Sequence, residues 1–269
     1  MNKIIAIVLL FIASTVQNIF GQALTYRIKS KYILTKENLA SIKTSGFKIS
    51  SKKDPTKNYS LCRNKLKVLV TQSAGALSLD PWAIDASTDD CVDDIDIINS
   101  QTDNDLIIDM NRRKVGQSTN TIKLPYSSFV IGVNAVALKI RPRITDINKK
   151  DYGRNVIGGT ITLGPTIGYT FGITTFTHRS ANSWSVTPGA SVGFGALSLK
   201  NEPLEKIADV SSSPSNLILS PSFNVILARN DIGLIVSYGW DNMTGGNHDA
   251  WAYQGKGFLA IGISAGLKL

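Results

Sequence analysis

The sequence predicts an all-β protein: an antiparallel, up-and-down transmembrane β-barrel of eight strands, preceded by a less regular N-terminal region. Two observations lead to this expectation. In the second half of the chain, apolar residues recur at every second position, which is the period of a β-strand. The positions between them hold Gly, Ser and Thr with almost no charge, whereas strand faces in contact with water usually carry charged residues. We therefore expect apolar faces in lipid and small polar residues in the lumen.

Residues 1–23 have the pattern of a secretory signal peptide. Lys3 precedes the apolar run 4–13, and the small residues Gly21 and Ala23 follow near the expected cleavage site. The run is shorter than the about 20 residues that a membrane-spanning helix needs. We expect export, a mature chain that begins near Leu24, and location in the outer membrane of a Gram-negative cell.

Residues 24–125 differ from the rest of the chain. Lys is frequent in the first half of this region and Asp in the second, and neither half alternates as a lipid-facing strand would. Short apolar runs at 66–70 and 106–108 are candidate strands. Because single-chain bacterial barrels have an even number of at least eight strands, we expect two barrel strands from about 65–79 and 106–123.

The chain contains two cysteines, Cys62 and Cys91. An exported protein folds where disulfides form, and the spacing is not the C-x-x-C of redox or metal sites. We expect a disulfide that restrains a loop-rich segment.

Residues 126–269 contain six strands that can be phased by their apolar faces. The clearest alternates Ile161, Leu163, Ile167 and Ile173 with Thr and Gly. Connections alternate between long and short, as in outer-membrane barrels, which places the C-terminus on the periplasmic side. The expected connections are 140–154, 177–182, 200–214, 230–231 and 242–255. Aromatic residues expected toward strand ends, where interfacial girdles lie, are Tyr169, Phe171, Trp184, Tyr238 and Trp240.

A soluble periplasmic sandwich or barrel is the alternative architecture, with the apolar face turned inward. The uncharged Gly, Ser and Thr faces favour the membrane barrel, because a water-facing surface would carry Lys, Glu, Asp or Arg.

The segments WAYQGKGF (251–258) and IGIS (261–264), together with the export signal and the Gly/Thr strands, resemble small outer-membrane β-barrel proteins of the Bacteroidota type. The resemblance covers roughly residues 126–269. It implies an outer-membrane barrel inserted by the barrel assembly machinery, and little about chemistry. The chain ends in Leu269, where many such barrels end in an aromatic residue.

Catalytic patterns are few. His248 and Asp249, with Asp241 nearby in the sequence, resemble the base and carboxylate of a barrel-embedded lipid or peptide hydrolase, although a polar loop pair is the commoner explanation. Residues 189–193 match G-x-S-x-G, but mid-strand, without the strand-turn-helix context of a nucleophile elbow. His178 is expected in a solvated turn. We expect no enzyme, no cofactor and no metal site.

Basic residues gather around the first long loop, on the side expected to face outward. Arg and Lys bind phosphate through charge-assisted hydrogen bonds, so this loop is a candidate site for lipopolysaccharide phosphates. Its residues are Lys139, Arg141, Arg143, Lys149, Lys150 and Arg154.

The formal net charge of +9 does not point to nucleic acid, because the basic residues are dispersed and the chain is expected to be exported. The function expected is non-enzymatic: a structural or interaction role, or a narrow passive passage, with membrane lipid as partner. The alternatives are the hydrolase and the soluble periplasmic protein.

Overall fold

The computed structural model describes residues 31–35, 65–73, 75–81, 106–110, 121–145, 148, 151–152, 161–206, 216–230, 232–245 and 248–267, and the segment 37–51 with gaps. Over these residues the fold is an antiparallel β-sheet, so the all-β prediction is confirmed. The signal peptide, Cys62 and Cys91 lie outside the described residues.

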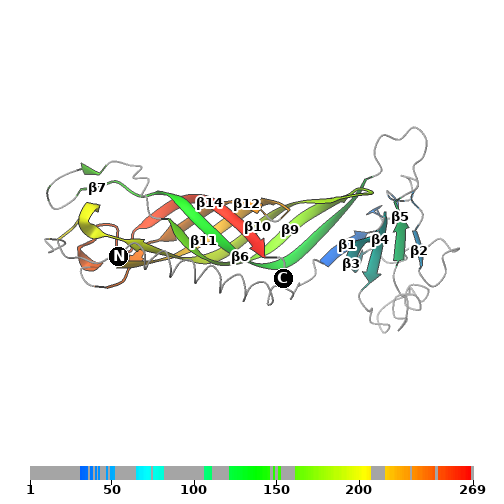
Figure 1. Cartoon of the computed structure of the whole chain (residues 1–269), viewed down its shortest axis with the longest axis horizontal. Helices are drawn as coiled ribbons and strands as arrows, with labels where there is room; N and C mark the ends of the chain where they lie inside the picture. Colours follow the sequence, from blue (N-terminus) through cyan, green and yellow to red (C-terminus); the bar gives the residue numbers. More distant parts are fainter. Residues whose placement is uncertain are drawn as a thin grey trace, which may run out of the picture.

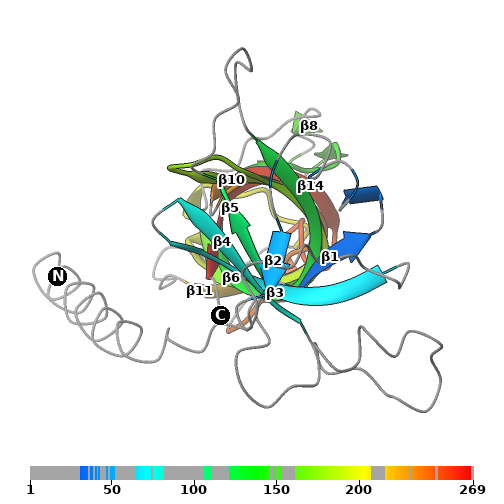
Figure 2. The same ribbon diagram turned by 90° about the vertical axis from the view of Figure 1, so that its right-hand side faces the viewer.

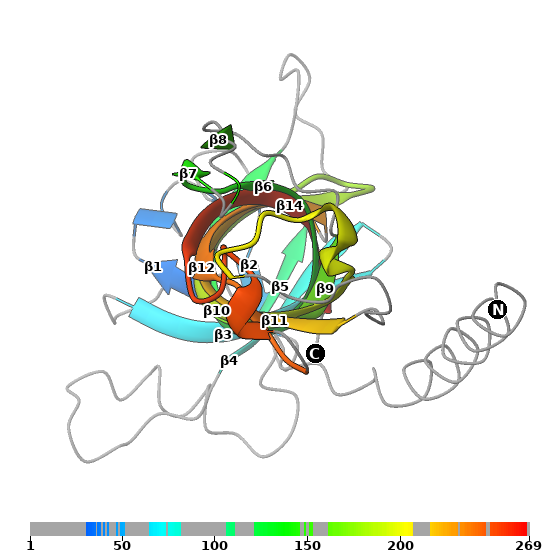
Figure 3. The same cartoon turned by 90° about the vertical axis from the view of Figure 1, so that its left-hand side faces the viewer.

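Six long strands pair in a closed ring. Each is hydrogen-bonded to two neighbours, in the order β6-β9-β10-β11-β12-β14, and β14 returns to pair with β6 over residues 259–267 and 131–140. Figures 2 and 3 show this ring from its two ends. Its strands are β6 (Ile122–Ile140), β9 (Thr162–Phe176), β10 (Ala181–Leu197), β11 (Asn216–Arg229), β12 (Ile232–Trp240) and β14 (Gly257–Leu267).

The expected number of eight strands is wrong. The described sheet contains twelve strands, of which six make the ring. Within 65–79, residues 65–73 and 76–79 form strands, and within 106–123, residues 106–109 form one; these strands continue the sheet outward from β6 and do not enter the ring, whereas Ile122 and Lys123 are the first residues of the ring strand β6. Their apolar residues pack into a buried core that also includes Ile122 and Leu124 of β6 and Phe176 of β9, which explains why they lack the lipid-facing alternation of the ring.

We call this second part the N-terminal sheet. It contains β1 (Lys31–Thr35), β2 (Ile49–Ser51), β3 (Lys65–Ser73), β4 (Ala76–Pro81) and β5 (Leu106–Asp109), in the order β1-β3-β4-β5-β2. β1 pairs with the first half of β6, so the sheet is hydrogen-bonded to the ring. It lies at one end of the elongated ring (Figure 1). Its fully buried side chains include Leu34, Leu77, Leu79 and Ile108.

The ring strands turn most of their apolar residues outward and their small polar residues inward, although Ile226 and Ile235 also face inward. On β9, Ile167 is 51% exposed while the preceding Thr166 is 3% exposed. The other inward threonines of this strand, Thr162, Thr170 and Thr174, are equally buried. The predicted facing of the two rows is therefore confirmed.

The connections alternate as predicted. Two short turns, 177–180 and 230–231, lie at the end of the ring that carries the N-terminal sheet, which we call the short-turn end. The described parts of three longer connections, at 141–161, 198–215 and 241–256, lie at the opposite, long-loop end (Figure 3). They contain β7 (Ile144–Thr145), β8 (Asp151–Tyr152), β13 (Asn242–Met243) and two 3-10 turns, Leu199–Asn201 and His248–Ala250.

The aromatic residues follow the girdle expectation in part. Trp184 lies near the short-turn end of β10, and Tyr238 and Trp240 lie at the long-loop end of β12. Tyr169, in contrast, lies in the middle of β9, opposite Phe129, and its hydroxyl donates a 3.0 Å hydrogen bond to Ser127 Oγ.

Candidate functional site: a buried ionic cluster at the long-loop end

A β-bulge directs Lys139 into the ring. Leu138 pairs with Ile261, but Val136 pairs with the next residue, Gly262, so that Ala137 is an extra residue on β6. An extra residue reverses the facing of every side chain that follows it. Before the bulge the odd positions face outward, and after it Leu138 and Ile140 do, which leaves Lys139 fully buried.

Lys139 and Arg141 share one carboxylate, that of Asp241, which directly follows β12. Lys139 Nζ lies 2.6 Å from Asp241 Oδ1. Arg141 donates from Nη2 at 2.7 Å and from Nε at 3.1 Å to Asp241 Oδ2. Ser220 Oγ on β11 accepts a 2.9 Å bond from Lys139 and donates a 2.6 Å bond to Asp241 Oδ1. The cluster thus joins three segments that are far apart in the sequence.

Aromatic rings enclose the two cations. Lys139 Nζ lies 4.3 Å from the ring centre of Phe258, and the guanidinium of Arg141 lies 5.4 Å from the Trp251 ring and 5.0 Å from the Tyr253 ring. A cation over an aromatic face is attracted by the ring quadrupole. Trp251 Nε1 in turn donates a 3.1 Å hydrogen bond to Glu202 Oε2. These contacts hold the long connections over the end of the ring.

The two carboxylates of this region have opposite pKa shifts. Burial acts to raise the pKa of Asp241, but the charges of Lys139 and Arg141 outweigh it and hold the pKa below its ordinary value of 3.8. Burial raises the pKa of Glu202 above 4.5, and the hydrogen bond from Trp251 and the charge of Arg141 offset only part of this. Asp241 is therefore the ionised partner that compensates the buried cations.

The lumen below the cluster is filled by hydroxyl and amide groups from several strands. Thr170 and Thr187 share a 2.6 Å hydrogen bond, and Ser191 and Ser222 share one of 2.8 Å. Asn224 Nδ2 donates to Ser191 Oγ at 3.1 Å. Polar groups buried in this way need such partners, because an unpaired group loses its hydration without compensation.

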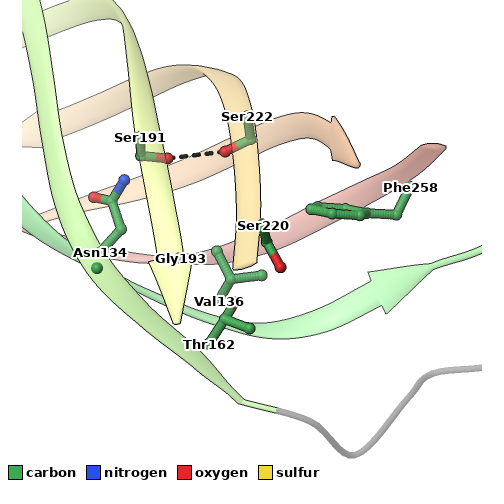
Figure 4. A pocket seen from close by; sticks show the side chains of 9 residues that line it. Asn134, Val136, Thr162, Ser191, Gly193, Ser220, Ser222 and Phe258 are labelled. Atoms are coloured by element: carbon green, nitrogen blue, oxygen red, sulfur yellow. Dashed lines mark hydrogen bonds between the residues drawn. The ribbon is translucent and has the colours of Figure 1, made fainter. Parts of the chain in front are cut away.

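A small cavity lies between these hydrogen bonds and the ionic cluster. Its volume is about 10 Å³, room for about one water molecule. Figure 4 shows Asn134 and Phe258 on different sides of it, with the Ser191–Ser222 hydrogen bond at its edge. Asn134 is 3% exposed and neither of its amide atoms has a protein partner. The cavity is lined by Asn134, Val136, Thr162, Gly164, Ser191, Gly193, Ser220, Ser222 and Phe258.

The structure divides the basic residues of the candidate phosphate site. Lys139 and Arg141 do not face the surface, because both are buried and paired with Asp241, so the expectation of a headgroup contact is corrected for these two. Arg143 is exposed. Lys149, Lys150 and Arg154 lie outside the described residues.

The catalytic patterns are not brought together. His248 Nε2 lies 2.8 Å from Asp249 Oδ1 in an exposed 3-10 turn, while Asp241 is committed to Lys139 and Arg141. Ser191 lies within β10 with its hydroxyl bonded to Ser222, not at a strand-turn-helix junction. His178 lies in the turn that follows β9.

Sequence reasoning missed the role of Asp241 and Ser220. The signal was present as the irregular alternation of β6, in which Val136 and Leu138 depart from the expected parity. A bulge that turns a lysine inward requires a nearby carboxylate, because a buried cation without a partner is very costly.

Within the described residues, no cluster of three or more His, Cys, Asp or Glu side chains is arranged to hold a metal ion. None of the helices in the part of the chain that the structure covers is long and apolar enough to cross a membrane. Comparison of the chain with protein family models, with characterised proteins and with solved structures finds no match.

Proposed function

We propose that this protein is a small outer-membrane β-barrel with a closed lumen, and that it acts as a non-enzymatic membrane anchor for the N-terminal sheet. The partners that this function implies are outer-membrane lipid and, during biogenesis, the barrel assembly machinery.

The observation that carries the proposal is the outer surface of the ring. Every large hydrophobic residue that is exposed in the described structure belongs to one of the six ring strands or, as Ile161, directly precedes one. Soluble monomers rarely expose continuous apolar patches larger than a few hundred Å². An apolar surface that encloses a whole ring suits acyl chains and does not suit water.

The distribution of charge supports the same conclusion. Among the described residues of the six ring strands, the charged ones are Lys123, Lys139 and Arg229. Lys139 is buried inside, and the other two lie near the short-turn end. The apolar row on β9 runs from Ile161 to Ile173, roughly 40 Å along the strand at ~3.3 Å per residue. A strand tilt of about 45° reduces this to about 30 Å, the thickness of a bilayer core.

The closed lumen favours an anchor over a passage. A ring of six strands is narrower than the eight-stranded barrels whose interiors side chains just fill. Here Thr, Ser and Asn, with Ile226 and Ile235, lie buried on the inner face, the ionic cluster and Trp251 lie at the long-loop end, and Tyr32 lies at the other end. Tyr32 comes from β1, and its hydroxyl shares a 3.1 Å hydrogen bond with Thr174 of β9.

The N-terminal sheet is joined to the ring by its backbone. β6 runs from the sheet into the ring without interruption, and β1 pairs with it at Lys31 and Tyr32. Barrels of this class have their short turns on the periplasmic side. The N-terminal sheet, which lies at the short-turn end, is therefore presented to the periplasm.

The two alternatives find less support. A hydrolase needs a base oriented toward a nucleophile, and among the described residues the exposed His248 is paired only with Asp249 and the backbone carbonyl of Gly245. A soluble protein would have to leave the apolar rows of all six strands in water.

Reconstitution into phospholipid vesicles tests the proposal. We expect membrane association that resists alkaline carbonate and urea, tryptophan fluorescence quenched by brominated acyl chains, and no channel current in a planar bilayer. A folded, monodisperse protein in detergent-free buffer that does not partition into vesicles would refute membrane insertion. A steady ionic current would refute the closed lumen but not the membrane location.

A further inference from the structure

Two outward rows of the ring end in a cation at the short-turn end. On β11, the exposed residues Val225 and Leu227 are followed on the same face by Arg229. On β6, the outward face that carries Phe129 ends in the exposed Lys123. Both cations therefore lie at the edge of the apolar surface, at the level where lipid headgroups would meet a membrane-inserted ring.

Arg229 is placed beside an interfacial tryptophan. Its guanidinium lies 5.5 Å from the ring centre of Trp184, the residue opposite it on β10. Trp184 is 63% exposed. Tryptophan prefers the headgroup level of membranes, and stacking leaves the guanidinium edge free to donate hydrogen bonds to phosphate.

Neither cation has a carboxylate partner among the described residues. At the long-loop end, in contrast, the exposed Lys256 lies 3.5 Å from the carboxylate of Glu205, and the carboxylate of Asp249 lies 2.8 Å from His248. In the sequence, the short turns 177–180 and 230–231 contain one acidic residue, Asp231. The same turns contain Arg179, which is exposed.

We propose that Arg229 with Trp184, and Lys123, bind the phosphates of anionic phospholipids in the leaflet on the short-turn side. This inference rests on the proposed membrane insertion. It moves the expected lipid-phosphate contact away from Lys139 and Arg141, which are buried at the opposite end. A basic residue near an anionic membrane surface gains about 1 kcal/mol, which is about a fivefold preference per cation for anionic over zwitterionic lipid.

The test is native mass spectrometry of the full chain in detergent, titrated with phosphatidylglycerol or with phosphatidylcholine. The wild type is expected to retain phosphatidylglycerol roughly 25-fold more tightly than phosphatidylcholine, if both cations contribute. The double variant Lys123→Gln with Arg229→Gln is expected to lose most of this preference. The matched control, Lys200→Gln with Lys206→Gln, removes the same charge at the long-loop end and is expected to keep it.

Each outcome decides the proposal. Equal retention of the two lipids by the wild type, or an equal loss in the test and control variants, overturns it. Displacement of phosphatidylglycerol by millimolar inorganic phosphate would assign the site to free phosphate instead and also overturns it. If the double variant does not fold, the single variant Trp184→Phe, which keeps an aromatic face, is measured in its place. A reduced preference of this variant for phosphatidylglycerol over phosphatidylcholine supports the role of Arg229 stacked on Trp184. Retained lipid preference with no vesicle insertion would reject the membrane anchor, whereas insertion without preference rejects only the lipid site.

Discussion

Substitution of Ile167 by arginine distinguishes a lipid-facing ring from a water-facing one. Ile167 is 51% exposed, lies on β9, and is equidistant along its apolar row from Ile161 and Ile173. Its direct neighbours in the ring are Ile131 of β6 and Ala190 of β10. In a membrane-inserted ring this position lies near the bilayer midplane.

The two environments predict different magnitudes. An arginine on the lipid face at the midplane costs about 2–4 kcal/mol, and the cost falls to about 0–1 kcal/mol near the interfaces. Ile167→Arg is therefore expected to reduce the folded-to-unfolded ratio by roughly 30-fold or more. If the same side chain faced water, the substitution would change stability by about 0.5 kcal/mol at most, because an exposed site loses no packing.

The assay is reversible unfolding by guanidinium in phospholipid vesicles, followed by tryptophan fluorescence. Ile161→Arg is the control, since Ile161 lies on the same face at the edge of the row and is also exposed. We expect Ile167→Arg to be destabilised by about 2 kcal/mol more than Ile161→Arg. Equal, near-zero effects of both substitutions would refute the membrane orientation of the ring.

Three further predictions concern the interior. Asp241→Asn leaves the buried Lys139 and Arg141 without a carboxylate and is expected to cost about 3–5 kcal/mol in the same unfolding assay, whereas no loss would show that the cluster is not structural. The pKa of Glu202 is raised in the folded state, so the stability that its protonated carboxyl contributes is full below pH 4.5 and is lost as the pH rises through the folded pKa. Glu202→Gln should therefore be more stable than the wild type at neutral pH. An identical dependence of stability on pH in the two proteins would count against the raised pKa. A Cβ on Gly168 would lie 2.7 Å from the carbonyl oxygen of Pro188, so Gly168→Ala is expected to lower stability by about 1–3 kcal/mol. The control Ala265→Val, on the exposed face, is expected to leave stability unchanged. If both variants are as stable as the wild type, the ring is packed more loosely than described.

The sequence was sufficient to predict the strands and their facing. A period of two is a local property, so the rows that contain Ile161, Ile167 and Leu234 could be assigned without knowledge of their neighbours. The alternation of long and short connections was also readable, because hairpin turns have local signals.

The number of ring strands and the ionic cluster depend on long-range pairing. Strands β3 and β5 read as strands, but nothing in their own residues shows that they pair outside the ring. The bulge at Ala137 is defined by the register with β14, more than a hundred residues later in the sequence. Because the bulge reverses the facing of Lys139, the same residue reads as outward in the sequence and lies inward in the structure.

The most direct test of the orientation compares isoleucine methyl groups by NMR in lipid nanodiscs. Ile167 faces out of the ring, whereas Ile235 on β12 faces inward and is fully buried. We expect nuclear Overhauser effects between the Ile167 δ1 methyl protons and acyl-chain methylene protons, and none from Ile235. Cross-peaks from Ile167 to bulk water, with no contact to acyl chains, would contradict the assignment of this surface to the membrane.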